Sequence, residues 1–576
     1  MRKILATLLA AALVLPGCVE VDGSLGEGLV DKSLLYDTYT VEFPLTDIRQ
    51  KMAGDLSGYS ATRLTVGAIR DEKLGLSTRE AAFALIPAMD TIDLGDNPTP
   101  VSFTLRFSKD TVSCNDESQM NILQNLRVTE LTGELPEADK AGCTQEIPHG
   151  SALITEGLPV YSGGDELSFS FTTAYAQKYI DAIRRIGPVL KERPKSDDIP
   201  ESDLIDMYDD WVEALPGIHL AMDAPEGNGG RINLFDFSCM SVSSGYYLRN
   251  NNVGVLKVHS TWKGVQKDSS FLFIPGERAF YDEVDYQAKN SKFDQYCFNR
   301  TTHSTTAGPA AAELLVEGGG GVKPVISARE LQQKTADAIA AEGRDPSKVI
   351  IVKASVILPF EMPASYKALD YFPTILSPTI RKVVEDGGKT YISFAGLTDA
   401  SVSTENQGDI DRSNLCYAPD ITYHLQEIMH PGEGLSTLTQ EALDEGQADI
   451  WLLTIHTEKT ANATGSIYDN DYYQQLMYAS YYNSIYGGGY GGYGGYGYGG
   501  YGYGGYGGYG GYGYNDYYSN YYNYMMLEQM MNASSQTSYT YSTTLDKDRF
   551  YRAVLNGPAA AGSTPIFRVT YAVPRG

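Results

Sequence analysis

Val101-Ser-Phe-Thr-Leu-Arg-Phe107 alternates apolar and polar side chains, which is typical of a β-strand that buries one face. Clusters of Asn, Gly, Pro and Asp separate such runs, as turns separate the strands of a sandwich. The pattern therefore predicts an all-β fold built from many short strands. Further short apolar runs of this length occur in the first half of the chain at 63–69, 82–86, 126–131, 167–171 and 218–222.

One region departs from the β pattern. Residues 175–190 and 202–215 carry apolar side chains at helical spacing, and Ser202 stands where an N-terminal helix cap is expected. The sequence therefore predicts a small helical insertion over about 175–215 on the β framework.

The second half of the chain repeats the plan of strands and turns. Val349–Leu358 is rich in β-branched residues, which predicts a strand buried on both faces. Ser327, with Glu330 three residues later, predicts a capped helix over 327–342.

A segment near residue 420 leaves two interpretations open. Residues 418–425 fit a strand, and residues 420–429 fit a short helical run that begins with polar side chains. With either interpretation, we expect two tandem β-sandwich domains, at 34–280 and at 281–576.

Residues 462–540 do not follow this pattern of short strands and turns. Every residue from Tyr486 to Tyr514 is Gly or Tyr, 18 and 11 in number. Because glycine raises the entropy cost of ordering, we expect a disordered loop without a packed element. It is either a flexible loop tolerated between two strands or an adhesive segment whose rings stack on sugars or on other aromatics. The tyrosines expected to make such contacts are Tyr490, Tyr493, Tyr496, Tyr501, Tyr506 and Tyr509.

Net charge narrows the classes of partner. The 576 residues include 45 Lys and Arg against 72 Asp and Glu, which gives a net charge of −27. So acidic a surface repels phosphate backbones, so we expect no nucleic-acid partner. The length predicts more than one domain, and a hydrophobic content of 42% is enough for packed cores.

The N-terminus has the pattern of a lipoprotein signal peptide. A basic start at residues 1–3 is followed by an apolar stretch at 4–15 that is too short to span a bilayer. Leu15-Pro16-Gly17-Cys18 resembles a bacterial lipobox, which predicts cleavage of residues 1–17 and acylation of Cys18. The acylated Cys18 would bind the lipid bilayer, and residues 18–33 would form a lipid-anchored tether.

Two acidic residues follow the predicted anchor. Glu20 and Asp22 resemble the surface-export signals of Bacteroidota lipoproteins. We therefore expect a lipid-anchored outer-membrane protein at the cell surface.

Five cysteines remain after Cys18, and in an oxidising compartment they predict disulfides. The simplest pairing joins Cys114 to Cys143 and Cys239 to Cys297, with Cys416 free, although sequence alone does not fix connectivity. No CxxC spacing occurs among them, so the sequence gives little support for a zinc or redox site.

A search for catalytic motifs in the sequence finds none. The seven histidines contain no HExxH pair, and the chain has neither a GxSxG nucleophile elbow nor a GxxxxGK[ST] phosphate loop. We therefore predict that the protein is not an enzyme and has no catalytic residues, no metal and no cofactor.

Several segments share the pattern of one family; they are Cys18–Gly26, Leu64–Gly75 with Ala81–Phe83 after it, Val128–Thr132, Glu317–Val322, Ile350–Ala354 and Pro565–Tyr571. Together they resemble a Bacteroidota lipoprotein family known as domain of unknown function 4270 (DUF4270). This resemblance implies an outer-membrane lipoprotein with an all-β body and without catalytic residues.

The later half has a second resemblance, carried by Ala354–Leu358, Asp420–Gln426 and Pro565–Tyr571. These segments resemble jelly-roll domains of the carbohydrate-module type. We therefore expect the sandwiches to be jelly-roll-like.

Two functions are compatible with these observations. The first is an accessory or structural subunit that docks on an outer-membrane β-barrel protein of an assembly or secretion complex. The alternative is a glycan-binding or adhesive surface lipoprotein that uses a jelly-roll face and the Tyr-rich loop.

Overall fold

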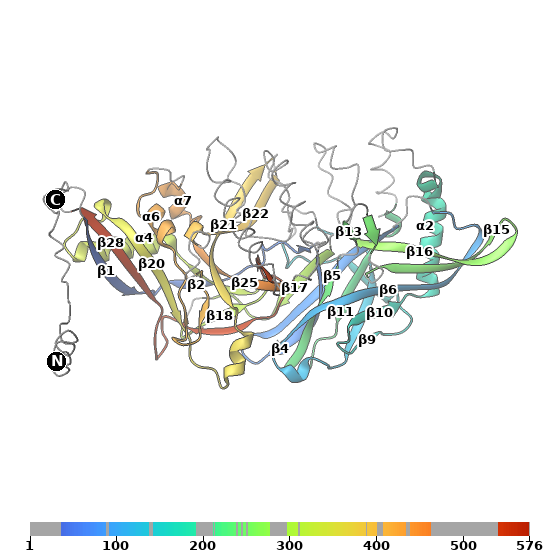
Figure 1. Cartoon of the computed structure of the whole chain (residues 1–576), viewed down its shortest axis with the longest axis horizontal. Coiled ribbons are helices and arrows are strands. Elements are labelled where there is room, and N and C mark those ends of the chain that lie inside the picture. Colours follow the sequence, from blue (N-terminus) through green and yellow to red (C-terminus); the bar gives the residue numbers. More distant parts are fainter. Residues whose placement is uncertain are drawn as a thin grey trace, which may run out of the picture.

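The computed structural model shows a mostly β fold, with sheets along the whole length of an elongated body (Figure 1). The predicted β-rich class is therefore confirmed. Among the described residues, no helix combines the length and the apolar character needed to cross a membrane. The structure describes residues 36–574 with gaps at 61, 88–91, 137–141, 192–210, 212, 238–239, 243–245, 249–251, 277–296, 309–310, 387–388, 400–406, 434–437 and 462–538.

The largest sheet contains thirteen of the described strands. Its main path runs β16-β15-β6-β12-β4-β5-β11-β7-β8; β10 pairs with β6, β9 with β7, and β17 with β3 and β5. The 101–107 stretch lies inside β6, which has 19 residues. The strands are β3 (Tyr59–Ser60), β4 (Arg63–Asp71), β5 (Gly75–Pro87), β6 (Asp96–Cys114), β7 (Gln124–Leu131), β8 (His149–Leu153), β9 (Val160–Tyr161), β10 (Glu166–Ser170), β11 (Ile218–Met222), β12 (Gly229–Asp236), β15 (Gly254–Trp262), β16 (Val265–Gly276) and β17 (Cys297–His303).

This sheet curls until two of its strands meet. β16 pairs with β15 along its length and also pairs with β5, from Phe273 opposite Pro87 to Gly276 opposite Ala84. The pairings therefore form a closed circuit through β16, β15, β6, β12, β4 and β5. Curling of this kind encloses the inward side chains and leaves fewer free strand edges.

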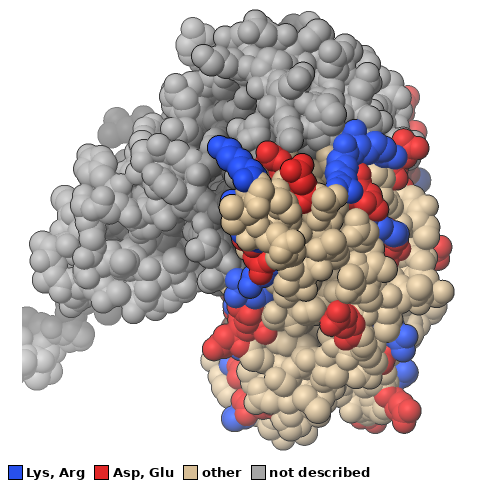
Figure 2. Space-filling model, turned by 90° about the vertical axis from the view of Figure 1, so that its right-hand side faces the viewer, with Lys and Arg blue, Asp and Glu red and all other residues tan. Residues whose placement is uncertain are grey.

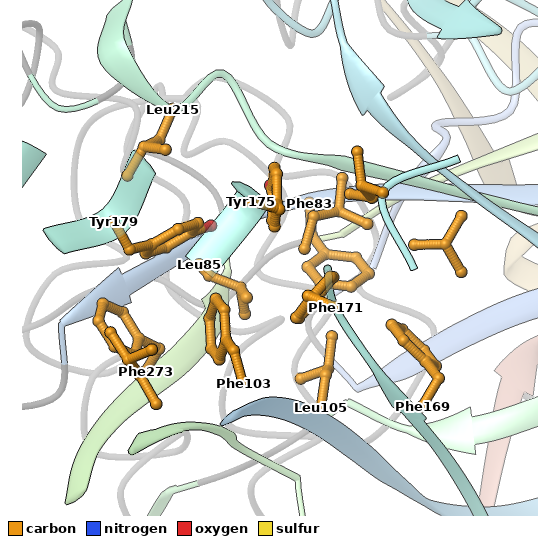
Figure 3. Packing of buried hydrophobic residues seen from close by; sticks show 14 of the residues in the cluster. Phe83, Leu85, Phe103, Leu105, Phe169, Phe171, Tyr175, Tyr179, Leu215 and Phe273 are labelled. Carbon is orange, nitrogen blue, oxygen red and sulfur yellow. The ribbon is translucent and has the colours of Figure 1, made fainter. Parts of the chain in front are cut away.

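Aromatic side chains fill the inside of the curled sheet (Figure 3). The ring centroid of Phe103, on β6, lies 4.7 Å from that of Phe171, 4.9 Å from that of Tyr179 and 5.5 Å from that of Phe273. Tyr179 belongs to helix α2 (Thr173–Lys191), so the helix packs its apolar side against this core. Burying one such ring contributes about 1.5–3 kcal/mol.

Two further sheets pack face to face; they are formed by residues 36–52 together with strands that follow residue 320. A common core receives Val356 and Phe567 from one sheet and Ile326 and Leu452 from the other. The five-stranded sheet has the order β1 (Tyr36–Pro44), β28 (Ile566–Pro574), β20 (Ile350–Pro359), β24 (Cys416–Tyr417) and β23 (Ile410–Asp411). The six-stranded sheet has the order β2 (Ile48–Met52), β19 (Val322–Ile326), β25 (Ile450–Ala461), β21 (Ile375–Asp386) and β22 (Lys389–Gly396), with β26 (Tyr539–Leu545) paired to β25. Two small antiparallel pairs are β18 (Glu313–Glu317) with β27 (Arg552–Asn556), and β13 (Met240–Val242) with β14 (Tyr246–Leu248).

The sheets do not follow the predicted domain boundary. β1 pairs with β28 along its whole length, so the first described strand lies beside the last. β2 pairs with β19 in the second half, and β17 pairs with β5 in the first sheet. The predicted division between 34–280 and 281–576 is therefore wrong as a division of the sheets, because strands from both sides of it cross over.

The helices agree with the sequence in most places. The predicted helix at 175–190 is confirmed as α2, whereas residues 202–210 lie outside the described residues and Trp211 is helical. The predicted cap at Ser327 is confirmed, because its Oγ accepts a hydrogen bond from the Glu330 amide at 3.4 Å. The remaining helices are α4 (Ala328–Ala341), α6 (Thr422–Met429) and α7 (Gln440–Asp444), with 3₁₀ turns η2 (Glu117–Gln119), η5 (Pro346–Lys348) and η6 (Tyr366–Tyr371).

The prediction that Val349–Leu358 is buried on both faces is wrong. In β20, Ala354, Val356 and Leu358 are buried, whereas Ser355 and Ile357 between them are partly exposed. The reason is the antiparallel pairing of β20 with β28, because antiparallel sheets commonly leave one face in solvent.

The Gly/Tyr-rich segment connects two neighbouring strands. β25 and β26 pair antiparallel, and Ala461 lies opposite Tyr539. The expected position between two strands is therefore confirmed, although residues 462–538 themselves lie outside the described residues. Because the two ends of the insertion meet, its closure entropy grows only slowly with its length.

We predict that Phe103→Ala lowers the free energy of unfolding by about 3–5 kcal/mol, because it removes a ring from the centre of the curled sheet. Val101→Ala is the matched control, since Val101 lies on the same strand and is 53% exposed; its expected cost is below about 1 kcal/mol. Urea titration followed by tryptophan fluorescence measures both. Equal losses in the two variants would contradict the inward placing of Phe103.

Candidate functional site

The segment Glu317–Val322 lies where the curled sheet, called here the first half, meets the part with the face-to-face sheets, called the second half. We call this contact the joint. A Cβ atom at Gly319 would lie 2.8 Å from Arg79 Nη2, and one at Gly320 would lie 2.7 Å from Cys143 Sγ. The chain approaches other backbone and side chains so closely here that only glycine fits. The glycine run that carries much of the family resemblance therefore has a packing reason.

Charged groups surround this glycine loop. The Lys323 ammonium donates hydrogen bonds to the carbonyls of Glu317, Gly319 and Gly321, the last two at 3.0 and 3.3 Å. Burial lowers the pKa of Lys323 to about 8. The Glu317 carboxylate accepts from the Val322 amide at 3.0 Å. Burial would raise the pKa of Glu317, but His303 and the other donors lower it below its usual value.

Two further cations or potential cations face the same loop from the first sheet. Arg79 Nη1 donates to Ser77 Oγ and to the Thr78 carbonyl, both at 3.0 Å, while its Nε and Nη2 have no hydrogen-bond partner among the described residues. His303 Nδ1 lies 3.4 Å from a Glu317 oxygen. Burial lowers the pKa values of Arg79 and His303, which favours the neutral form of the imidazole.

A turn at 546–551 completes the joint. The Asp546 carboxylate is fully buried and accepts from Arg549 Nη1 at 2.9 Å and from the Tyr551 hydroxyl at 2.5 Å. Burial opposes its ionisation, but the Arg549 charge and these hydrogen bonds hold the pKa of Asp546 well below its usual range. Lys547 extends to the first half and donates to the Ser57 carbonyl at 2.9 Å.

The geometry of this joint gives it a structural role. Arg79, Glu317 and Lys323 are each no more than 2% exposed, so a substrate has no access to their polar atoms. A buried network of this kind fixes one arrangement of its partners, because every broken contact leaves an uncompensated charge. We therefore assign the cluster to joining the halves of the protein.

A second titratable cluster lies on the outer side of the first sheet. The His149 and His219 rings stack with centroids 3.9 Å apart, and Arg300 contacts Glu80 at 3.0 Å. Burial opposes ionisation of Glu80, but His219 and Arg300 lower its pKa to about 2. Within the described part of the chain, no group of three His, Cys, Asp or Glu side chains could hold a metal ion.

The predicted disulfides are not formed. Cys114 at the end of β6 and Cys143 at the joint are both free thiols, so their predicted pairing is wrong. Cys143 Sγ instead accepts from Thr301 Oγ1 at 3.5 Å. Cys297 is also free, which contradicts its pairing with Cys239, a residue outside the described residues. Burial raises the pKa of Cys297, so this thiol stays protonated.

The fifth cysteine agrees with its prediction. Cys416, at the start of β24, is a free thiol as expected. Burial raises its pKa, which argues against a reactive thiolate.

The remaining predicted site residues lie outside the described residues. These are the lipidation site Cys18 and the six tyrosines Tyr490, Tyr493, Tyr496, Tyr501, Tyr506 and Tyr509.

The surface carries a groove that the sequence analysis missed. It has a volume of about 260 Å³ and lies on the outer face of the five-stranded sheet. In the sequence, the residue that could have indicated this groove is Lys353, because it is a charged residue inside the apolar run at 349–358. The lining residues are Lys353, Ser355, Ile357, Ala418, Arg568 and Thr570.

Comparisons with family models, with curated proteins and with solved structures find no match to this chain. The resemblance to DUF4270 therefore stays a prediction that rests on the sequence segments.

We predict that Asp546→Asn lowers the free energy of unfolding by about 3–5 kcal/mol at pH 7, because Arg549 keeps its buried charge without a partner. Asp116→Asn is the control, since Asp116 is an exposed helix cap and Asn caps equally well. Urea titrations of both variants measure the difference.

The same pair of variants tests the ionisation of Asp546. Its pKa is lower in the folded state than the unfolded value near 3.8, so its stabilising effect is complete above that pH and is lost as the pH falls below it. The difference in the free energy of unfolding between wild type and Asp546→Asn should therefore become smaller below pH 3.8. A difference that stays constant would show that Asp546 is not ionised in the fold.

Proposed function

We propose that this protein is a non-enzymatic, lipid-anchored outer-membrane protein that acts as an accessory subunit on an outer-membrane β-barrel protein. The lipobox-like segment ending at Cys18 and the resemblance to DUF4270 support the anchor and the location. The perturbed groups around Glu317 and Lys323 have structural partners and are enclosed, so they do not argue for catalysis.

An apolar patch at a free sheet edge carries the docking part of this proposal. Among the described strands, β9 pairs with β7 alone, and Asn125 lies opposite Val160. Leu123 just before β7 is 73% exposed, and Val160 on β9 is 53% exposed. Met120 and Leu158 are also exposed nearby, next to η2 and β9.

Such an edge suits a protein partner. Exposed apolar side chains in one place are unusual on a soluble surface and mark interaction sites. An unpaired strand edge offers backbone donors and acceptors to a strand of a partner. Both features fit an extended segment of a partner, such as a loop of a β-barrel protein.

The surface charge also fits a protein partner. Figure 2 shows the end of the molecule with α2 and the β15–β16 hairpin, where Lys and Arg stand among Asp and Glu around a broad area with few charged side chains. Protein interfaces are depleted of charge at their centre, so a surface of this kind favours protein contacts over binding of a polyanion.

Glycan binding is the second candidate function. The face-to-face sheets of the second half support the proposal of a jelly-roll-like sandwich, and we extend the same proposal to the first half. The groove of about 260 Å³ on the outer face of one sheet is the specific observation that favours sugar binding.

We predict that Cys18→Ser abolishes membrane attachment, because the thiol is the only predicted site of acylation. The wild type should sediment with outer membranes and stay in the detergent phase of a Triton X-114 separation, and the variant should not. Cys416→Ser is the control and should behave as the wild type. Membrane attachment of Cys18→Ser would remove the lipoprotein part of the proposal.

We predict that Leu123→Asp reduces co-purification of the β-barrel partner at least about tenfold, because it places a charge in the apolar patch. Val383→Asp is the matched control, since Val383 is 55% exposed on β21 in the other half. Both variants are purified from native membranes in mild detergent, and recovered proteins are quantified by mass spectrometry. If wild type recovers no β-barrel protein, the accessory-subunit proposal fails.

A further inference from the structure

We infer that the groove on the outer face of the five-stranded sheet binds the carboxylate of an acidic sugar unit, with Lys353 as the cation that recognises it. The inference rests on the second proposed function, glycan binding, and names its ligand class.

A β-bulge places the recognising cation. In β20 the pairing with β28 shifts between Ile351, opposite Tyr571, and Lys353, opposite Thr570. Val352 therefore has no partner on β28, and the register after it moves by one residue. Without this shift the alternation of β20 would turn Lys353 toward the core, because Ile351 is buried. The bulge thus places a lysine at the groove in the middle of an apolar run.

The register of three strands then builds a polar face around this lysine. Thr570 on β28 lies between Lys353 on β20 and Thr40 on β1. The hydroxyl oxygens of Thr40 and Thr570 lie 2.9 Å apart, so they form a hydrogen bond. One step along the strands, Arg568 lies between Ser355 and Glu42.

The two cations of the groove differ in what they already bind. The Arg568 guanidinium forms an ion pair with Glu42, which neutralises much of its charge. The Lys353 side chain is exposed, and its ammonium forms no ion pair or hydrogen bond with any described residue. The groove therefore presents one uncompensated positive charge in a chain of net charge −27, and that charge complements a single anionic group.

The other lining groups fit a sugar ring. Ser355 and Thr570 supply hydroxyls that donate and accept hydrogen bonds, as sugar hydroxyls require. Ile357 and Ala418 supply an apolar surface for the C–H face of a ring. A volume of about 260 Å³ lies below the range of about 300–1,000 Å³ for drug-sized ligands, so the groove fits one sugar unit of a chain.

The test measures binding of oligogalacturonate, an acidic sugar chain, to the full-length acylated protein in detergent micelles by isothermal titration calorimetry. Two further probes are the methyl-esterified form of the same oligosaccharide and inorganic phosphate. We expect binding of the acid and at least tenfold weaker binding of the ester, because only the acid offers a carboxylate to Lys353.

Two variants locate the binding. Lys353→Gln should weaken binding of the acid at least tenfold, and Ser355→Val should weaken it without changing the charge. Lys348→Gln is the matched control, since Lys348 is an exposed lysine on η5 that pairs with Asp345 at 3.3 Å; it should bind as the wild type. Thermal unfolding of each variant confirms that the fold is intact.

The outcomes separate this inference from the function on which it rests. Equal binding of acid and ester, or unchanged binding by Lys353→Gln, would overturn the carboxylate site and leave glycan binding standing. Displacement of the sugar by equimolar inorganic phosphate would overturn it in favour of a simple anion site. If none of the oligosaccharides binds, glycan binding itself fails, whereas the accessory-subunit proposal is tested separately through Leu123→Asp.

Discussion

The close approach of the backbone at Gly318–Gly321 is the contact on which the rest of the structure depends. At Gly320 the loop touches Cys143 of the first half, and at Gly318 it touches the Arg549 carbonyl of the turn at 546–551. Charged side chains surround this loop, and apolar side chains of the two halves, among them Leu234 and Phe550, also pack together at the joint. Such a joint has one geometry, because a shift would leave buried charges without partners.

The path of the chain strengthens the same joint. The first described strand, β1, pairs with the last, β28, and the following strand, β2, pairs with β19. The chain then forms the curled sheet. β17, which follows residue 280 in the sequence, pairs with β5 of that sheet. The predicted tether therefore leads into β1, a strand of the sheet that carries the groove.

Local sequence patterns predicted elements well where the cause was local. The alternation at 101–107 predicted one buried face, and Phe103, Leu105 and Phe107 are buried on it, because a strand turns every second side chain to the same face. Val101 lies on the same face by this rule but is exposed, which the alternation did not predict. The choice at 418–429 was only partly local. Within the segment, Asp420 accepts from the Thr422 amide at 2.9 Å, but the distant Asp399 carboxylate also accepts from the Tyr423 and His424 amides at 2.5 and 3.0 Å. The pattern within the segment contains the first contact and not the second.

The sequence by itself determined the β-rich class, the helix α2 with its apolar face, the Ser327 cap and the position of the Gly/Tyr-rich insertion between strands. These features depend on the order of polar and apolar residues along a few turns or one strand. Only the tertiary structure decided which strands share a sheet, that Cys114 and Cys143 stay apart, and that a bulge brings Lys353 beside Thr570. The physical reason is that pairing register and chain crossing join residues hundreds of positions apart, and composition and periodicity do not record such contacts.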